Sequence, residues 1–196
     1  MKISAIIPTI HRPHLQTTLE SLKECDEVIT IYDTSVCPID RANRLKNTWT
    51  GDFLLGINDR SWLSPGWRNE VEECFRKINY HGIVNFNTNT VMNGVISRSF
   101  FDRYYLGYLA WPEYIRYFWD QELGHRARME HCYIQTKGGI LHTIDRDGSG
   151  GFPTPQAQVD WDKKIYYARE KINFQPQYVC DMKERNKLAN MDIFKI

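Results

Sequence analysis

The spacing of hydrophobic residues in the first half of the chain predicts a repeated strand–helix unit. Short apolar runs bounded by turn-forming residues predict strands over 2–7, 27–32 and 53–57. Apolar residues three and four positions apart predict helices over 12–22, 41–46 and 65–77. The order strand, helix, strand, helix, strand, helix is typical of βαβ units in a largely parallel sheet.

The second half has shorter and less regular apolar runs. They predict strands over 82–86, 90–97, 132–136 and 139–144, with the last two joined at Lys137-Gly138. Helices are predicted over 99–108, 119–129, 160–171 and 182–191. A stretch dense in Gly and Pro, 147–155, predicts a loop. We therefore expect an α/β domain over 1–155 and a C-terminal helical extension over 156–196.

The third predicted strand stops abruptly at Asn58-Asp59-Arg60. In an open α/β sheet, ligands bind at the carboxyl ends of the strands, so Asp59 is a candidate site residue. Asp and Asn are also common turn residues, and an acidic strand-to-helix turn without a function explains the same pattern.

The composition excludes some classes of binding partner and predicts the cellular compartment. Lys and Arg number 25 against 24 Asp and Glu, so the formal net charge of +1 is too small to attract the chain to nucleic acid. No apolar run reaches the length of a membrane span, and the N-terminal run is too short for a signal peptide, which predicts a cytoplasmic protein. Five scattered cysteines without a CxxC pair predict reduced thiols and no zinc cluster. The glycines at 148–151 lack the GKS/T of a P-loop.

Three separated stretches share their order and spacing with one enzyme family. They are 6–22 (IIPTIHRPHLQTTLESL), 31–35 (IYDTS) together with 41–67, and 93–101 (NGVISRSFF) followed by 119–128 (WDQELGHRAR). Together they resemble the GT-A-fold glycosyltransferases, specifically the inverting family-2-like group, over the first three quarters of the chain. The small size is similar to that of glycosyltransferase-like proteins of viruses of hyperthermophilic archaea, which would place it in a host cytoplasm.

The resemblance implies a GT-A (Rossmann-like) sheet and a sugar transferred with inversion from a UDP- or GDP-type donor to a glycan, protein or lipid acceptor. The positions that match the family's nucleotide-binding loops and helix are Pro8, Thr9, Arg12, Asp33, Arg41, Asn58 and Arg60. Asn43 matches a further polar position on the helix before the third strand.

The metal site that the resemblance implies is altered in this chain. Asn58-Asp59-Arg60 falls on the family's D-x-D motif, whose carboxylates hold a divalent metal on the sugar diphosphate, and Asp59 is the one carboxylate left. His142 falls where some members supply a further metal ligand. Either Asp59 and His142 bind Mn²⁺ or Mg²⁺, which we favour, or the Arg60 guanidinium supplies the positive charge.

The catalytic base that the resemblance implies is Asp120, which would take a proton from the acceptor hydroxyl as its oxygen attacks the anomeric carbon. Glu122, on the same helical turn, is the alternative base. The structural explanation for Asp120 is an N-cap of the 121–129 helix, a role that Asp fills well.

Two other function classes remain open from the sequence. A nucleotidyltransferase would need a basic Gly-rich loop after the first strand, which IIPTIHRP lacks. A nucleotide- or sugar-binding relic, or a virion assembly protein, would explain the loss of carboxylates from the D-x-D site. The apolar stripe of the C-terminal helices predicts packing on the domain, with a homodimer contact or a weak membrane-surface contact as alternatives.

Overall fold

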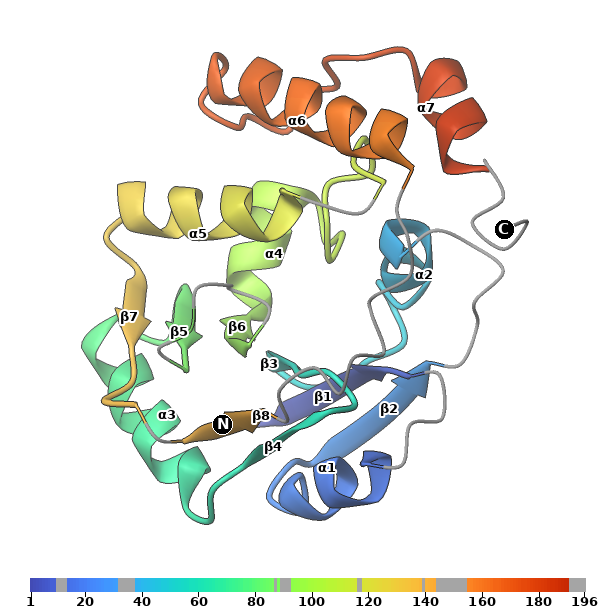
Figure 1. Ribbon diagram of the computed structural model, residues 1–196. Helices are drawn as coiled ribbons and strands as arrows, with labels where there is room; N and C mark the ends of the chain where they lie inside the picture. Colours follow the sequence, from blue (N-terminus) through green and yellow to red (C-terminus); the bar gives the residue numbers. More distant parts are fainter. Residues whose placement is uncertain are drawn as a thin grey trace.

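The computed structural model describes residues 1–9, 14–31, 38–86, 88, 93–115, 118–138, 140–143 and 155–190. Its strands are β1 (Ile3–Pro8), β2 (Glu27–Ile31), β3 (Phe53–Gly56), β4 (Ser61–Leu63), β5 (Ile83–Asn85), β6 (Gly94–Ser97), β7 (Tyr133–Gln135) and β8 (Leu141–Thr143). Its helices are α1 (Leu15–Ser21), α2 (Pro38–Arg44), α3 (Trp67–Lys77), α4 (Arg98–Tyr105), α5 (Trp119–Met129), α6 (Gln156–Glu170) and α7 (Met182–Ala189). Figure 1 shows their arrangement.

Six of the described strands form one sheet in the order β2-β1-β3-β6-β5-β7. β1 pairs in parallel with β2 and β3, and β5 pairs in parallel with β7. β6 lies between β3 and β5 and runs antiparallel to both. The predicted fold class, an α/β protein with a mostly parallel sheet flanked by helices, is confirmed.

Alternate residues of the strands supply the two halves of the core, as the period of a strand requires. Along β1, Ile3, Ala5 and Ile7 join a cluster with α3, whereas Ile6 joins a second cluster with α2, α4, α5 and α6. Figure 1 shows α1 and α3 on one side of the sheet and α4, α5 and α6 on the other. The sheet is therefore buried on both faces, and its strand ends are left as the place for polar side chains.

The predicted hairpin at Lys137-Gly138 is wrong. Tyr133–Gln135 pairs in parallel with β5, and Leu141–Thr143 pairs with β4 in a separate two-stranded sheet. The strand β4, Ser61–Leu63, is not among the predicted strands, because three residues are too few to show an alternation. Its Ser61 and Leu63 are nevertheless buried on one side, as in a strand.

The C-terminal helices pack on the rest of the protein. Trp161 and Ile165 of α6 are buried in the same cluster as α4 and α5. The predicted apolar stripe thus faces inward, which confirms packing on the domain and leaves these two residues out of any dimer or membrane contact. Among the described helices, none is long and apolar enough to cross a membrane. The division of the chain at 155 and 156 stays a prediction.

Candidate functional site

The strand ends that should hold a ligand lie in one row. The register pairs Ile6 with Gly56, Gly56 with Gly94, and Gly94 with Asn85. A Cβ atom at Gly94 would lie 2.6 Å from the Val84 carbonyl oxygen, so this close crossing requires glycine. Since β1 and β3 are parallel neighbours, the residues that follow them emerge at the same edge.

Two of the predicted site residues meet at this edge. The Thr9 hydroxyl donates to the Asp59 carboxylate, with 2.8 Å between Oγ1 and Oδ2, and both side chains are buried. The Thr9 amide also donates to the Ile31 carbonyl oxygen at 3.0 Å, which ties the end of β1 to the end of β2. The Asp59 carboxylate is therefore fixed where the carboxyl ends of three strands converge.

Asn58 and Arg60 have different roles in the loop. The Asn58 side-chain oxygen accepts from the Arg60 amide at 2.9 Å and from the Ser61 hydroxyl at 3.0 Å, so it shapes the turn. The Arg60 Nη1 atom is buried and has no hydrogen-bond partner among the described residues. A buried guanidinium nitrogen without a partner is uncommon, and a phosphate oxygen would satisfy it.

The second predicted metal ligand is engaged elsewhere. The Nε2 atom of His142 lies 2.7 Å from the Ser64 hydroxyl, and its ring stacks on Trp62 at 5.5 Å between centroids and 17° between planes. In the part of the chain that the structure describes, no three His, Cys, Asp or Glu side chains gather to hold a metal. The sharing of a metal by Asp59 and His142 stays a prediction. One carboxylate suits an ion that takes most of its ligands from phosphate and water.

The other nucleotide-binding positions are only partly described. Pro8 ends β1 and pairs with Ile31. Arg12, Asp33 and the side chain of Arg41 lie outside the described residues.

Asn43 has a structural task that the sequence did not reveal. Its amide nitrogen donates to the Ala110 carbonyl oxygen at 2.8 Å, and its oxygen accepts from the Leu109 and Ala110 amides at 3.0 Å each. The side chain holds the loop after α4 and is not free for a nucleotide.

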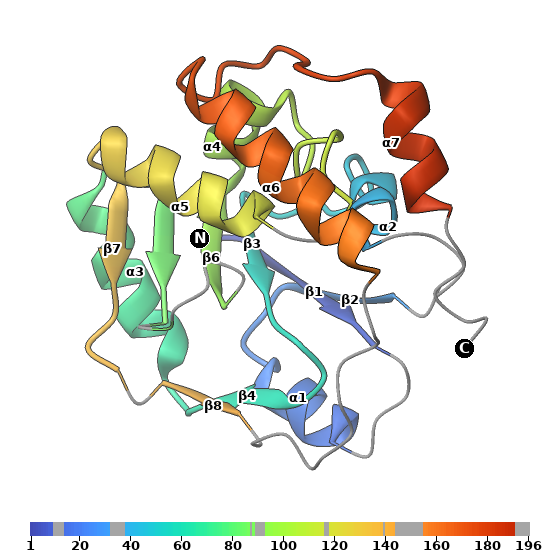
Figure 2. The same cartoon turned by 45° about the horizontal axis from the view of Figure 1, so that its top comes forward.

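Asp120 lies in the first turn of α5, which runs across the sheet from the middle of the molecule toward β7 (Figures 1 and 2). The N-cap is Phe118, with φ of 65° and no side-chain capping bond, so the N-cap explanation for Asp120 is wrong. Burial raises the pKa of Asp120, opposed by hydrogen bonds from the Gln121 and Asp120 amides. A raised pKa makes the carboxylate a stronger base.

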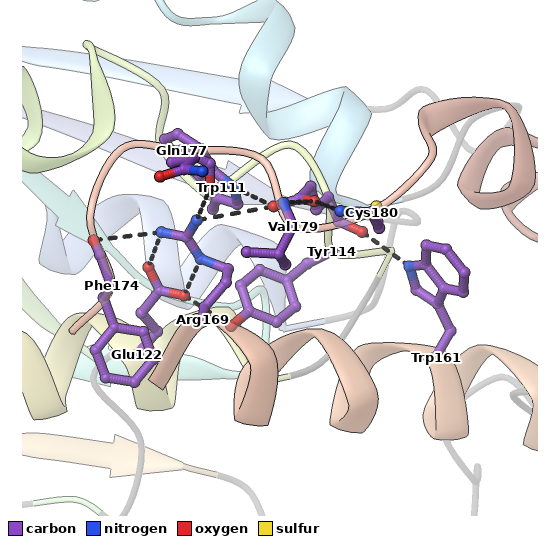
Figure 3. Close-up of polar contacts among 10 residues, drawn as sticks. Trp111, Tyr114, Glu122, Trp161, Arg169, Phe174, Gln177, Val179 and Cys180 are labelled. Atoms are coloured by element: carbon purple, nitrogen blue, oxygen red, sulfur yellow. Dashed lines mark hydrogen bonds and ion pairs between the residues drawn. The ribbon is translucent and has the colours of Figure 1, made fainter. Parts of the chain in front are cut away.

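Glu122 has both carboxylate oxygens occupied. Arg169 of α6 donates from Nε and Nη2 to its two oxygens at 2.7 Å each, and the Tyr114 hydroxyl donates at 2.7 Å (Figure 3). The side chain has 0 % exposure, so an acceptor hydroxyl does not reach it. The alternative assignment of the base to Glu122 is therefore corrected: this carboxylate is part of the interior, whereas Asp120 is partly exposed.

Comparison with known proteins identifies the fold. No protein-family model and no curated protein match the chain. Solved structures of S. aureus TarS, a GT-A-like glycosyltransferase, do match. The TarS 1–349 complex with UDP-GlcNAc is 11% identical with a TM-score of 0.64, over 96% of this chain and 70% of that one. The TarS 1–349 complex with UDP is 10% identical with a TM-score of 0.56, over 87% and 72%.

A longer TarS structure is 10% identical with a TM-score of 0.62 over 96% of this chain, which spans 42% of the TarS length. At these identities the likeness concerns the architecture. The chain shares its fold with TarS, which is a GT-A-like glycosyltransferase.

Proposed function

We propose that this protein transfers a sugar from a nucleoside diphosphate sugar of the UDP or GDP type to an acceptor. The observation that carries the proposal is the buried Thr9–Asp59 pair at the carboxyl edge. The next residue in the chain, Arg60, has a buried Nη1 atom without a partner among the described residues. The match of the fold to the TarS complex with UDP-GlcNAc supports a UDP-type donor. The polar edge would hold the diphosphate, with the sugar directed toward α5.

In the proposed reaction, the acceptor oxygen attacks the anomeric carbon from the face opposite the diphosphate, and the bond to the diphosphate breaks. Asp120 takes the acceptor proton, and Arg60 donates hydrogen bonds to the departing phosphate oxygens. The stereochemistry at the anomeric carbon is inverted, because a single displacement occurs. A divalent ion bound at Asp59 would supply further positive charge to the diphosphate.

A calorimetric titration with UDP, GDP, TDP and CMP tests the proposal at its first step. Tight binding of UDP or GDP identifies the base, whereas TDP and the monophosphate CMP serve as comparisons. Release of the bound nucleotide from its sugar derivatives then identifies the sugar. Glycan, protein and lipid acceptors are compared by the stimulation of nucleotide release. If neither UDP nor GDP binds, the proposed function is wrong.

The loss of carboxylates from the D-x-D position favours one second candidate, a protein that binds the nucleotide sugar without transferring it. Binding without release of nucleotide, with every acceptor class and with Mn²⁺ present, would identify this function.

We expect Arg60→Ala to weaken binding of the nucleoside diphosphate by roughly 10-fold or more, because a charge-assisted hydrogen bond contributes about 1.5–3 kcal/mol. We expect Asp59→Asn to abolish any enhancement of binding by Mn²⁺. Calorimetry of both variants with and without Mn²⁺ measures the two effects separately. Unchanged binding in both variants would show that the diphosphate binds elsewhere.

We expect Asp33→Ala to weaken nucleotide binding without unfolding the protein. Asp33 follows β2, and its carboxylate would accept hydrogen bonds from the base. Thermal unfolding and calorimetry with the nucleoside diphosphate check both parts. An unchanged dissociation constant would exclude the assignment.

A further inference from the structure

The inward face of α6 is unusually polar for a helix that packs on a core. Three side chains on it, Gln158, Asp162 and Arg169, have 0 % exposure beside the buried Trp161 and Ile165. Apolar residues alone would dock a helix, and buried charges carry a desolvation cost. Polar groups at these positions therefore fix where neighbouring segments lie, a role known for buried polar residues in other proteins.

The first segment held by α6 is the chain just before α5. Asp162 accepts from the Ile115 amide at 2.7 Å, and the Trp161 indole donates to the Glu113 carbonyl oxygen at 3.0 Å. Arg185 of α7 donates from Nη2 to the Tyr114 carbonyl oxygen at 2.7 Å. The backbone of three consecutive residues, Glu113 to Ile115, is thus held by hydrogen bonds with the C-terminal helices.

The second segment is α5 itself, which Arg169 holds through the two bonds to Glu122. The guanidinium also donates to the Gln177 carbonyl oxygen at 3.0 Å and lies 4.0 Å from the centroid of the Trp111 ring (Figure 3). These contacts on several sides hold the Arg169 guanidinium in one orientation. Its two hydrogen bonds to the carboxylate therefore fix the position of Glu122.

The turn between α6 and α7 is anchored to the same region. The Glu113 carboxylate accepts from the Val179 and Cys180 amides at 2.6 Å each and from the Trp111 indole at 2.7 Å. Residues 155–190, which we term the C-terminal strap, therefore contact the chain on both sides of Asp120: at Glu113 to Ile115 before it, and at Glu122 after it.

We propose that the C-terminal strap positions the first turn of α5 for sugar transfer, with Arg169 and Asp162 as positioning residues that set the place of Asp120. The inference rests on the proposed function. Its physical basis is that Asp120 stands five residues after one anchored position, Ile115, and two residues before the other, Glu122. A helix end held at two points presents its carboxylate in one place, which a proton transfer during attack requires.

Arg169→Lys tests the proposal, because lysine keeps the charge but cannot make the paired bonds to Glu122. Turnover of the donor identified by titration should fall by about 10²-fold, the scale of a small misplacement, with an unchanged nucleotide dissociation constant. The acid limb of the pH–rate profile should move to lower pH, because looser packing admits water to Asp120. The matched control is Arg68→Lys, which alters a half-buried arginine paired with Asp26 at 3.0 Å. This control should change neither the turnover nor the pH–rate profile.

A second pair of variants covers the case in which Arg169→Lys does not fold. Asp162→Asn keeps an oxygen for the Ile115 amide and should retain turnover, whereas Asp162→Ala should lose it. Normal turnover and a normal pH profile in folded Arg169→Lys, or equal loss in the two Asp162 variants, would overturn the proposal.

Hydrogen exchange of the 119–123 amides separates failure of this inference from failure of the proposed function. If the parent protein neither binds nor turns over nucleotide sugars, the proposed function fails. Faster exchange confined to these amides in Arg169→Lys would still support the holding role, and unchanged exchange would overturn it.

Discussion

Asp120→Asn is expected to lower sugar transfer by about 10²- to 10⁴-fold, the usual scale for loss of a general base. The amide has the shape of the carboxylate but cannot take a proton from the acceptor. Nucleotide binding should hardly change, because the proposed diphosphate contacts are made by Asp59 and Arg60. The measurement is nucleotide release with the identified acceptor, compared with calorimetry on the same preparation.

The same variant should keep its stability. Phe118, not Asp120, is the N-cap of α5, so no side-chain cap is lost. Burial raises the pKa of Asp120, so the native state holds this proton more tightly than the unfolded chain does. Stability from this group therefore decreases as pH rises from the unfolded pKa to the folded pKa, and removing the charge does not reduce stability at neutral pH.

Asp102→Asn, which removes an exposed acid from α4, is the control for Asp120→Asn and should transfer normally. A folded Asp120→Asn protein with normal transfer would contradict the assignment and direct attention to Asp145 and Asp147, outside the described residues. An unfolded one would indicate a structural role.

Arg169→Met is expected to lower the free energy of unfolding by about 3–5 kcal/mol, because it leaves the Glu122 carboxylate buried without its partner. Both side chains of the pair have 0 % exposure, so water cannot replace the lost bonds without opening the structure. Urea unfolding followed by circular dichroism measures the loss.

The double variant Arg169→Met with Glu122→Leu separates charge from packing. Replacing both partners by apolar residues of similar volume is often neutral for stability, so most of the loss should be recovered. If the double variant is as unstable as Arg169→Met, packing and not the uncompensated charge explains the loss.

The sequence predicts those helices and strands that are long enough for the spacing of their apolar residues to show a period. Helix 119–129 is observed as Trp119–Met129, and the first three strands and helix 65–77 are found within a few residues. The spacing of apolar residues does not show in which direction a strand runs or which strand it pairs with. The antiparallel direction of β6 and the pairing of β8 with β4 therefore could not be predicted. Three-residue strands such as β4 are too short to recognise.

The candidate site could also be predicted from the sequence only in part. Thr9 and Asp59 follow parallel neighbouring strands, so their meeting follows from topology. Glu122 was placed in the site because it shares a turn with Asp120, and nothing nearby in sequence reveals its partner. Arg169 is 47 residues away, close in sequence to Lys163, Lys164 and Lys171, where it has the pattern of a solvated basic surface. Long-range pairs of charges are invisible to local spacing.

The separation of Glu122 and Arg169 also has a consequence for biosynthesis. At about 5–20 residues per second, a ribosome needs roughly 2 to 10 s to add the 47 residues between them. During this interval the Glu122 carboxylate lacks its Arg169 partner, so we expect α5 to be incompletely packed. We therefore expect the layer of helices on this face of the sheet to form completely only after the strap has left the ribosome. Nascent chains that stall before residue 169 are expected to expose this layer to chaperones and proteases.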